Sequence, residues 1–356
     1  MTQNQWPPQL APFGVRWTGF LEKVRGRVQE IDAEARAGYA EVISHDAVDG
    51  TGMTGVSSAL KARLLQLAAK VDDQWSKIDS ELDSVEVSGR VGGYFRAQLV
   101  SMTGAFKRWL ERETERMIMQ GEAEWARALH QAALAEVAIP VACQHCGAPL
   151  EKPMWHQSIN VTCGACRAVS VVTPGTAASM FVGGTGAIFL AREIAWDQWC
   201  QMQDAEALWH RIRHKTLEDL GRWEQANRSY WQCYASAMGN FIPSWTAQTV
   251  QDEVTGKMSQ FLQWTAQDDR TVRENNSVGV NAVAAGDPNQ VVGWVQRQRD
   301  PSDAAEMLIN ASLERGWTQH AQWVAQLLGP VVARDEPGWA AEKLDECSYY
   351  YATRGD

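Results

Sequence analysis

Apolar residues recur three and four positions apart along most of the first 140 residues. Such spacing places them on one face of a helix. It predicts three long amphipathic helices, from about Phe20 to Val42, from Leu60 to Val85 and from Tyr94 to Ala138. Glycine-rich stretches at residues 49–55 and 88–93 separate them, as turn sequences do. Helices this long are typical of an elongated bundle or coiled coil, because the average globular helix has only about 11–12 residues.

The helical pattern is interrupted at residues 140–175 and then resumes. Val-rich stretches at residues 159–161 and 169–172 have the composition of short strands. Helical periodicity returns near Ala187 and continues to about Met238, with Gly221 as a candidate kink. A further helix is expected over residues 246–264, after a stop at Gly239.

The C-terminal third contains a stretch without a clear period and a weak internal repeat. Residues 266–286 are interpreted as a linker or mobile loop. Residues 301–312 and 337–348 match at an offset of 36, which suggests two copies of a helical repeat. Ordinary helix starts, with proline near the first position, explain much of the same match.

These patterns together predict a mainly α fold. We expect an elongated helical bundle with a small β module inserted between long helices, and a small, repeat-like helical region at the C-terminus. The expected divisions are residues 1–139 for the bundle, 140–175 for the inserted module, 176–265 for its helical continuation, 266–286 for the linker and 287–356 for the C-terminal region.

The inserted module carries the clearest chemical motif in the chain. Two C-x2-C pairs are separated by 16 residues, and the cysteines are Cys143, Cys146, Cys163 and Cys166. This spacing lets four thiolates reach one tetrahedral zinc ion about 2.3 Å away. Gly147 and Gly164, beside the two pairs, favour tight turns with positive φ.

The sequence from Cys143 to Leu150 and from Val161 to Cys166 resembles the zinc-ribbon family. The resemblance covers about residues 140–175, and no family is recognised for the rest of the chain. It implies two cysteine knuckles joined by short β-strands. Because four thiolates close the coordination sphere, we expect one structural zinc ion per chain. An iron centre on the same cysteines, or His145 or His156 in place of one cysteine, are the alternatives.

A second candidate metal site lies on the helix expected after the ribbon. Residues at steps of four share one helix face, and the set is Glu206, His210, His214 and Glu218. Histidines one turn apart are a known metal-ligand arrangement. However, Arg211, Arg213 and Lys215 on the same segment would oppose a cation, so a solvated face with Glu–His and Glu–Arg pairs is favoured.

Tryptophan is unusually frequent, with 17 residues in the chain. Five of them fall in the segment after the ribbon: Trp196, Trp199, Trp209, Trp223 and Trp231. Large aromatic side chains dominate both core and interface energetics. They therefore indicate either a broad core between long helices or a face that binds a partner.

Charge and targeting signals narrow the class of protein. With 33 Lys+Arg against 43 Asp+Glu, the net charge is −10, which disfavours a nucleic-acid coat. The ribbon offers only Lys152 and Arg167 as cations, with Trp155 and His156 as stacking groups. The N-terminus has no signal-peptide pattern, and the cysteine usage fits a reducing cytoplasm.

One uncharged stretch requires a separate interpretation. Residues 168–191 carry no charge, and a membrane helix needs about 20 predominantly apolar residues. Pro174 and several glycines interrupt the stretch, so we expect a buried strand, turn and helix start and no membrane span. The remaining cysteines, Cys200, Cys233 and Cys347, suggest no role.

Three functions from different classes are compatible with the sequence. The favoured one is a non-enzymatic cytoplasmic scaffold or protein-interaction protein, which associates with a protein partner or with itself and is stabilised by structural zinc. The alternatives are a nucleic-acid-associated factor that reads through the ribbon, and a metalloenzyme that uses His210 and His214. No phosphate-binding loop, dinucleotide fingerprint or nucleophile elbow is present to favour an enzyme.

Overall fold

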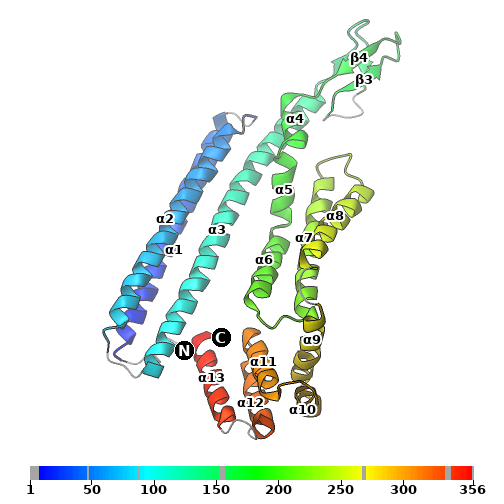
Figure 1. The fold of residues 1–356 in the computed structure, drawn as a ribbon. Helices are drawn as coiled ribbons and strands as arrows, with labels where there is room; N and C mark the ends of the chain where they lie inside the picture. The colour runs from blue at the N-terminus through cyan, green and yellow to red at the C-terminus, as the bar shows by residue number, and fades with distance from the viewer. Residues whose placement is uncertain are drawn as a thin grey trace.

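The computed structural model describes residues 8–45, 48–85, 89–151, 157–266, 270–332 and 338–354. The protein is mainly helical, with short strands in the cysteine-bearing insertion, as the sequence predicts. Figure 1 shows a long helical bundle with the insertion at one end and a group of C-terminal helices at the other.

Three long helices form the N-terminal bundle. They are α1 (Ala11–His45), α2 (Thr51–Leu82) and α3 (Gly89–Ala138). Each follows the expected apolar stripe but begins several residues earlier than the stripe does. Side chains from all three, such as Val28, Leu64 and Leu99, are buried in one continuous core. At about 1.5 Å per residue, α3 alone is about 75 Å long.

One close approach ties the three helices together near the middle of the bundle. The ring of Tyr39 on α1 packs directly against Gly121 on α3, so that a Cβ atom at Gly121 would overlap the ring. The Tyr39 hydroxyl lies 3.0 Å from the hydroxyl of Ser57 on α2. Only glycine leaves α3 room for this aromatic side chain.

The described residues of the insertion between α3 and the next helix form two small antiparallel sheets. Strand β1 (Val141–Ala142) pairs with β2 (Pro149–Leu150), and β3 (Ile159–Thr162) pairs with β4 (Val169–Val172). In the larger sheet, Ile159 lies opposite Val172 and Thr162 lies opposite Val169.

The chain then returns along α3 as a series of separate helices. These are α4 (Thr176–Gly183), α5 (Gly186–Ile194), α6 (Trp196–Arg211), α7 (Leu217–Gly239) and α8 (Ala247–Thr265). The expectation of one helix from Ala187 to Met238 was wrong. The chain breaks at Ala195 and again before α7, where a capping box at Thr216 starts a new helix. Gly221 lies within α7 and does not end it.

The uncharged stretch at residues 168–191 runs from the end of the insertion into the helices that follow it. It forms β4, α4 and the first part of α5, so it is divided among three elements. Within the described ranges, no helix is long and apolar enough to cross a membrane.

Five helices make up the C-terminal region. They are α9 (Arg270–Ala284), α10 (Pro288–Gln296), α11 (Pro301–Glu314), α12 (Thr318–Val332) and α13 (Trp339–Arg354). Helix α12 packs on α11 and on α13, and α13 contacts α3. The matching segments of the internal repeat lie at the starts of α11 and α13, although Pro337 is outside the described residues. The repeat itself stays a prediction.

Helix α9 corrects the interpretation of residues 266–286 as a linker or loop. Its buried face includes Arg273, Ser277, Val280 and Val283, at helical spacing. Two of these four residues are polar, so the face lacked the apolar period that identifies a helix in sequence.

The glycine contact in the bundle leads to a first prediction. Replacing Gly121 by alanine should lower the free energy of unfolding by about 1–3 kcal/mol, because the added methyl group overlaps the Tyr39 ring. Gly26 in α1 is the matched control, since a Cβ there meets nothing within 4 Å. Gly26→Ala should raise stability by about 0.5–1 kcal/mol. Urea unfolding followed by circular dichroism measures both, and equal effects would contradict the tight contact.

Candidate metal centre

The four cysteine side chains of the insertion converge on one point. All four sulfur atoms, from Cys143, Cys146, Cys163 and Cys166, lie within 4.8 Å of one another. The sulfur atoms of Cys143 and Cys166 are 3.6 Å apart, as are those of Cys146 and Cys163. A disulfide would need about 2.05 Å. A tetrahedral ion with zinc–sulfur bonds of about 2.3 Å needs sulfur atoms about 3.8 Å apart, which the cluster closely matches.

Each pair of cysteines lies on a tight turn that is held by two main-chain hydrogen bonds. In the first turn, the Cys143 N–H donates to the Ala148 carbonyl at 2.8 Å, and the Gly147 N–H donates to the Cys143 carbonyl at 2.9 Å. The first pair is therefore positioned by the backbone, before any ion binds.

The second turn repeats this pattern with one unexpected residue. The Cys163 N–H donates to Ala168 at 2.8 Å, and the Arg167 N–H donates to Cys163 at 2.9 Å. Arg167 has φ 63°, and its counterpart Gly147 has φ 72°. The expectation that Gly164 takes a positive φ was wrong. An arginine in this left-handed conformation costs about 1–2 kcal/mol, which the geometry of the cysteine turn has to offset.

The turns also favour the thiolate form that binds zinc. The backbone N–H groups of Cys146 and then His145 hydrogen-bond to the Cys143 sulfur, and they lower the pKa of Cys143 to about 6. The equivalent N–H groups of the second turn lower the pKa of Cys163. These two buried cysteines are thus prepared to bind as anions.

The pKa of Cys166 shifts in the opposite direction, so this thiol is neutral unless a cation is bound. The Ala168 N–H lowers the pKa of Cys166, but the neighbouring thiols outweigh it and raise that pKa to about 12. Four thiolates cannot lie this close together without a positive charge between them. A bound divalent ion supplies that charge and deprotonates the coordinating thiols.

A long-range cap anchors the ribbon to the bundle. The carboxylate of Glu136, near the end of α3, accepts hydrogen bonds from the N–H groups of Ala177 and Ala178 at 3.1 and 3.0 Å. These groups open α4, where a negative charge is favourable. A Cβ atom at Gly175 would overlap the carboxylate. Because the partners are about 40 residues apart, no local sequence signal indicates this cap.

The second candidate metal site is not assembled as its spacing suggested. Helix α6 ends at Arg211, so His214 lies between helices and Glu218 lies on α7. His210 is exposed, and its Nε2 lies 3.9 Å from Glu206. Among the described residues, the four cysteines are the only group of three or more side chains that could hold a metal ion.

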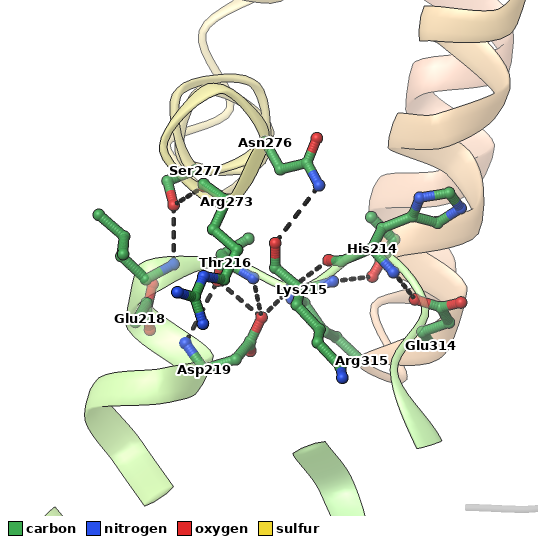
Figure 2. Close-up of polar contacts among 12 residues, drawn as sticks. His214, Lys215, Thr216, Glu218, Asp219, Arg273, Asn276, Ser277, Glu314 and Arg315 are labelled. Carbon is green, nitrogen blue, oxygen red and sulfur yellow. Dashed lines mark hydrogen bonds and ion pairs between the residues drawn. The ribbon is translucent and has the colours of Figure 1, made fainter. Parts of the chain in front are cut away.

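The segment between α6 and α7 instead binds the C-terminal helices (Figure 2). The His214 N–H donates to Glu314 at 3.2 Å, and Arg315 donates to the His214 carbonyl at 3.1 Å. On the α9 side, the Leu217 N–H donates to the Ser277 hydroxyl at 2.9 Å. Burial lowers the pKa of the His214 side chain, although Glu314 opposes this shift.

A buried ion pair lies at the centre of this junction. Arg315, the residue that directly follows α11, binds Asp219 of α7, and both side chains are only 2% exposed. Arg222 of α7 also lies 3.3 Å from the Asp219 carboxylate. Asp219 also accepts a hydrogen bond from the Thr216 N–H at 3.0 Å, within the capping box that starts α7. The Asp219 carboxylate therefore caps the start of α7 and also forms the ion pair that connects α7 to the C-terminal helices.

The tryptophans after the ribbon divide between core and surface. Trp209 and Trp223 are buried and stack with ring centroids 5.6 Å apart. Trp196 and Trp199 stack at 4.8 Å and are half-buried, as is Trp231. Two of the five are therefore core residues, and a partner-binding role for the other three stays a prediction.

The other sequence candidates lie outside the metal cluster or outside the described residues. His145 is exposed and does not join the sulfur atoms. Lys152, Trp155 and His156 fall within residues 152–156, which the structure does not describe. Of the lone cysteines, Cys347 is buried, and burial raises its pKa to about 11.

No family model, curated protein or solved structure matches this chain. The resemblance to zinc ribbons therefore depends on the cysteine cluster and its turns. What the geometry supports is a four-cysteine site that could bind a metal ion, consistent with a zinc-ribbon-like module.

The four-cysteine cluster leads to a prediction about the metal content of the purified protein. We expect about one zinc ion per chain. Cys143→Ser should lose the ion, because three thiolates do not complete the tetrahedral site. The melting temperature should then fall, because the ribbon loses the stabilisation that metal coordination gives. Cys200→Ser, outside the cluster, should change neither. Acidification should release the zinc, because protons compete with the ion for the thiolates. Release should occur below pH 6, since the pKa of Cys143 is about 6 without the ion and a bound cation lowers it further. A chromogenic chelator measures the release, and a Cys143→Ser protein with full zinc and stability would contradict the site.

The junction makes a prediction about stability. Arg315→Ala should lower the free energy of unfolding by about 3 kcal/mol, because the buried Asp219 then keeps only Arg222, which is half-exposed and 3.3 Å away, as a cation among the described residues. Arg297→Ala, at an exposed position after α10, is the control and should have little effect. Replacing both partners by leucine should recover much of the loss. Urea unfolding of the four proteins tests this, and a single variant as stable as the control would refute the role of the pair.

Proposed function

We propose that this chain is a non-catalytic adaptor protein, in which a zinc-stabilised ribbon docks onto a protein partner. The observation that carries the proposal is the outward face of the β3–β4 sheet. Val169 and Val171 are 62% and 60% exposed there. Exposed, adjacent valines on a small sheet are costly in water and are typical of a surface that binds another molecule.

The two faces of this sheet differ sharply in burial. Ser170 and Val172 are buried and pack toward the cysteine cluster. Val169 and Val171 alternate with them and lie opposite Thr162 and Asn160 on the other strand. Because successive side chains in a strand point to opposite faces, this register places both valines on the outer face.

An extended segment of a partner protein fits this surface best. Among the described residues, β4 pairs with β3 and with no other strand, so its outer edge has unpaired N–H and C=O groups. An incoming strand would satisfy these groups and cover the valines. The ribbon lies at the end of the bundle opposite the C-terminal helices, where it is accessible (Figure 1).

The alternative functions have less support. The described ribbon residues, 141–151 and 157–172, contain Arg167 as their single lysine or arginine, and Glu151 balances it. Binding to phosphates needs several such cations. A metalloenzyme would need His210 and His214 on one face, and the end of α6 separates them.

The test uses the position of Val171 directly. A photo-crosslinking amino acid at residue 171 identifies the protein that contacts the ribbon in cells, and that protein is then purified. We expect it to bind the full chain, and Val169→Lys with Val171→Lys to weaken binding by at least about tenfold, because charges replace the apolar contact. The double variant should keep its zinc.

The matched control is Val15→Lys, a substitution at an exposed valine on α1. It should leave binding unchanged. Three results would overturn the proposal: equal loss with Val15→Lys, crosslinking only to a second copy of the chain, or salt-dependent binding to nucleic acid in place of protein.

A further inference from the structure

A pocket of about 620 Å³ opens in the side of the bundle, between α2, α3 and α5. Its lining includes Glu115, Ile118, Glu122, Trp125, Phe189 and Arg192. The first four recur at steps of three and four on α3, so they form one stripe of that helix. The charged residues Asp49 and Lys61 also line the pocket. Facing helices of a bundle are a common place for ligand sites.

Glu122 is the unusual group in this pocket. Its side chain is only 18% exposed, and within the described chain its carboxylate accepts no hydrogen bond. The Arg192 guanidinium lies 3.8 Å away, beyond hydrogen-bond distance. Burial raises the pKa of Glu122; Arg192 counters this shift, and the nearby carboxylate of Glu115 adds to it. A mostly buried carboxylate with so little protein support is costly unless something else binds it.

Trp125 supplies a second polar group without a partner. Its side chain is 2% exposed, and among the described residues its indole N–H has no hydrogen-bond acceptor. The ring packs so closely against Gly50 that a Cβ atom there would be 2.8 Å from it. Within the described part of the chain this N–H thus has no acceptor, and a ligand in the pocket can supply one.

Among the described residues, no other polar side chain of the lining, Lys61 included, forms an ion pair with Glu122 or accepts a hydrogen bond from Trp125. The hydroxyl of Ser57, which lines the same pocket, already pairs with Tyr39 at 3.0 Å. The Tyr39 ring is held in place by Gly121, next to Glu122 in the chain. The site is thus rigid on the side of α1 and α2, while Ile118 and Phe189 provide apolar surface.

We infer that this pocket binds a small organic cation, an aliphatic amine that also carries an oxygen acceptor. Its ammonium group lies between Glu122 and Glu115, and its carbon chain contacts Ile118 and Phe189. Its oxygen accepts the hydrogen bond of the Trp125 indole. An anion is disfavoured because the lining has three carboxylates, from Asp49, Glu115 and Glu122, against the two cations Lys61 and Arg192. A metal ion is disfavoured because these carboxylates do not form a metal-binding group with a third ligand in the described chain.

Arg192 acts as a competing internal cation in this arrangement. Its side chain is 41% exposed, so it can move toward solvent when an ammonium group approaches Glu122. Removing it should strengthen binding of the amine. This direction distinguishes a ligand site from a simple ion pair between Glu122 and Arg192.

The experiment is isothermal titration of the full-length protein with 5-amino-1-pentanol at low salt. We expect one saturable site per chain, with 1-pentanol and pentanoate giving no binding. Glu122→Gln should weaken binding at least about tenfold, because the charged hydrogen bond to the ammonium is lost. Glu124→Gln, on the exposed side of α3 two residues away, is the matched control and should bind normally. Arg192→Gln should bind more tightly than the wild type.

Several results would overturn the inference. These are no saturable binding by the wild type, binding only after Arg192 is removed, preference for pentanoate, or equal binding by Glu122→Gln. If Glu122→Gln fails to fold by circular dichroism, Glu115→Gln replaces it, with a loss of several-fold expected. The variant with lysines at positions 169 and 171 should bind the amine normally, so this test is independent of the role proposed for the ribbon.

Discussion

The burial of apolar side chains along α3 is the interaction on which the rest of the structure depends. Leu99, Phe106 and Leu110 of this helix pack in the same core as α1 and α2, while Leu129 packs in the same core as Phe181 of α4. A single amphipathic helix has little stability alone, and tertiary packing of its apolar positions supplies most of it. Because α3 contacts α1, α2, α4, α5 and α13, it also sets the distance between the two ends of the molecule.

The ribbon differs from the bundle in what can stabilise it. An insertion of about 35 residues buries too little apolar surface to fold on its own, and metal coordination commonly replaces the missing core. Its own buried cluster contains Cys143, Leu150, Cys163 and Val172, so two of the four candidate metal ligands are also core residues. Glu136 then fastens the returning chain to α3. The candidate metal site and the packing of the helices therefore lie together at one end of the bundle.

Buried charge serves two different purposes elsewhere in the molecule. At the junction of α7 and α11, Asp219 has both a guanidinium and a helix start as partners, so the charge is well compensated. In the pocket beside α3, the one cation paired with Glu122 among the described residues is Arg192, 3.8 Å away. The first arrangement orients two parts of the chain. The second is poorly compensated within the protein, which is why we assign a ligand to it.

The sequence alone determined the features that depend on near neighbours along the chain. The three long helices and the four-cysteine motif were predictable, because helical stripes and C-x2-C turns arise from spacings of two to four residues. The helix at residues 270–284 was missed because its buried face includes Arg273 and Ser277, which find their environment only in the folded protein. Tertiary structure alone decided that His214 bonds to Glu314, 100 positions away, and that Glu136 caps α4. Contacts at such separation depend on how complete helices pack, and no local pattern of residues records that packing.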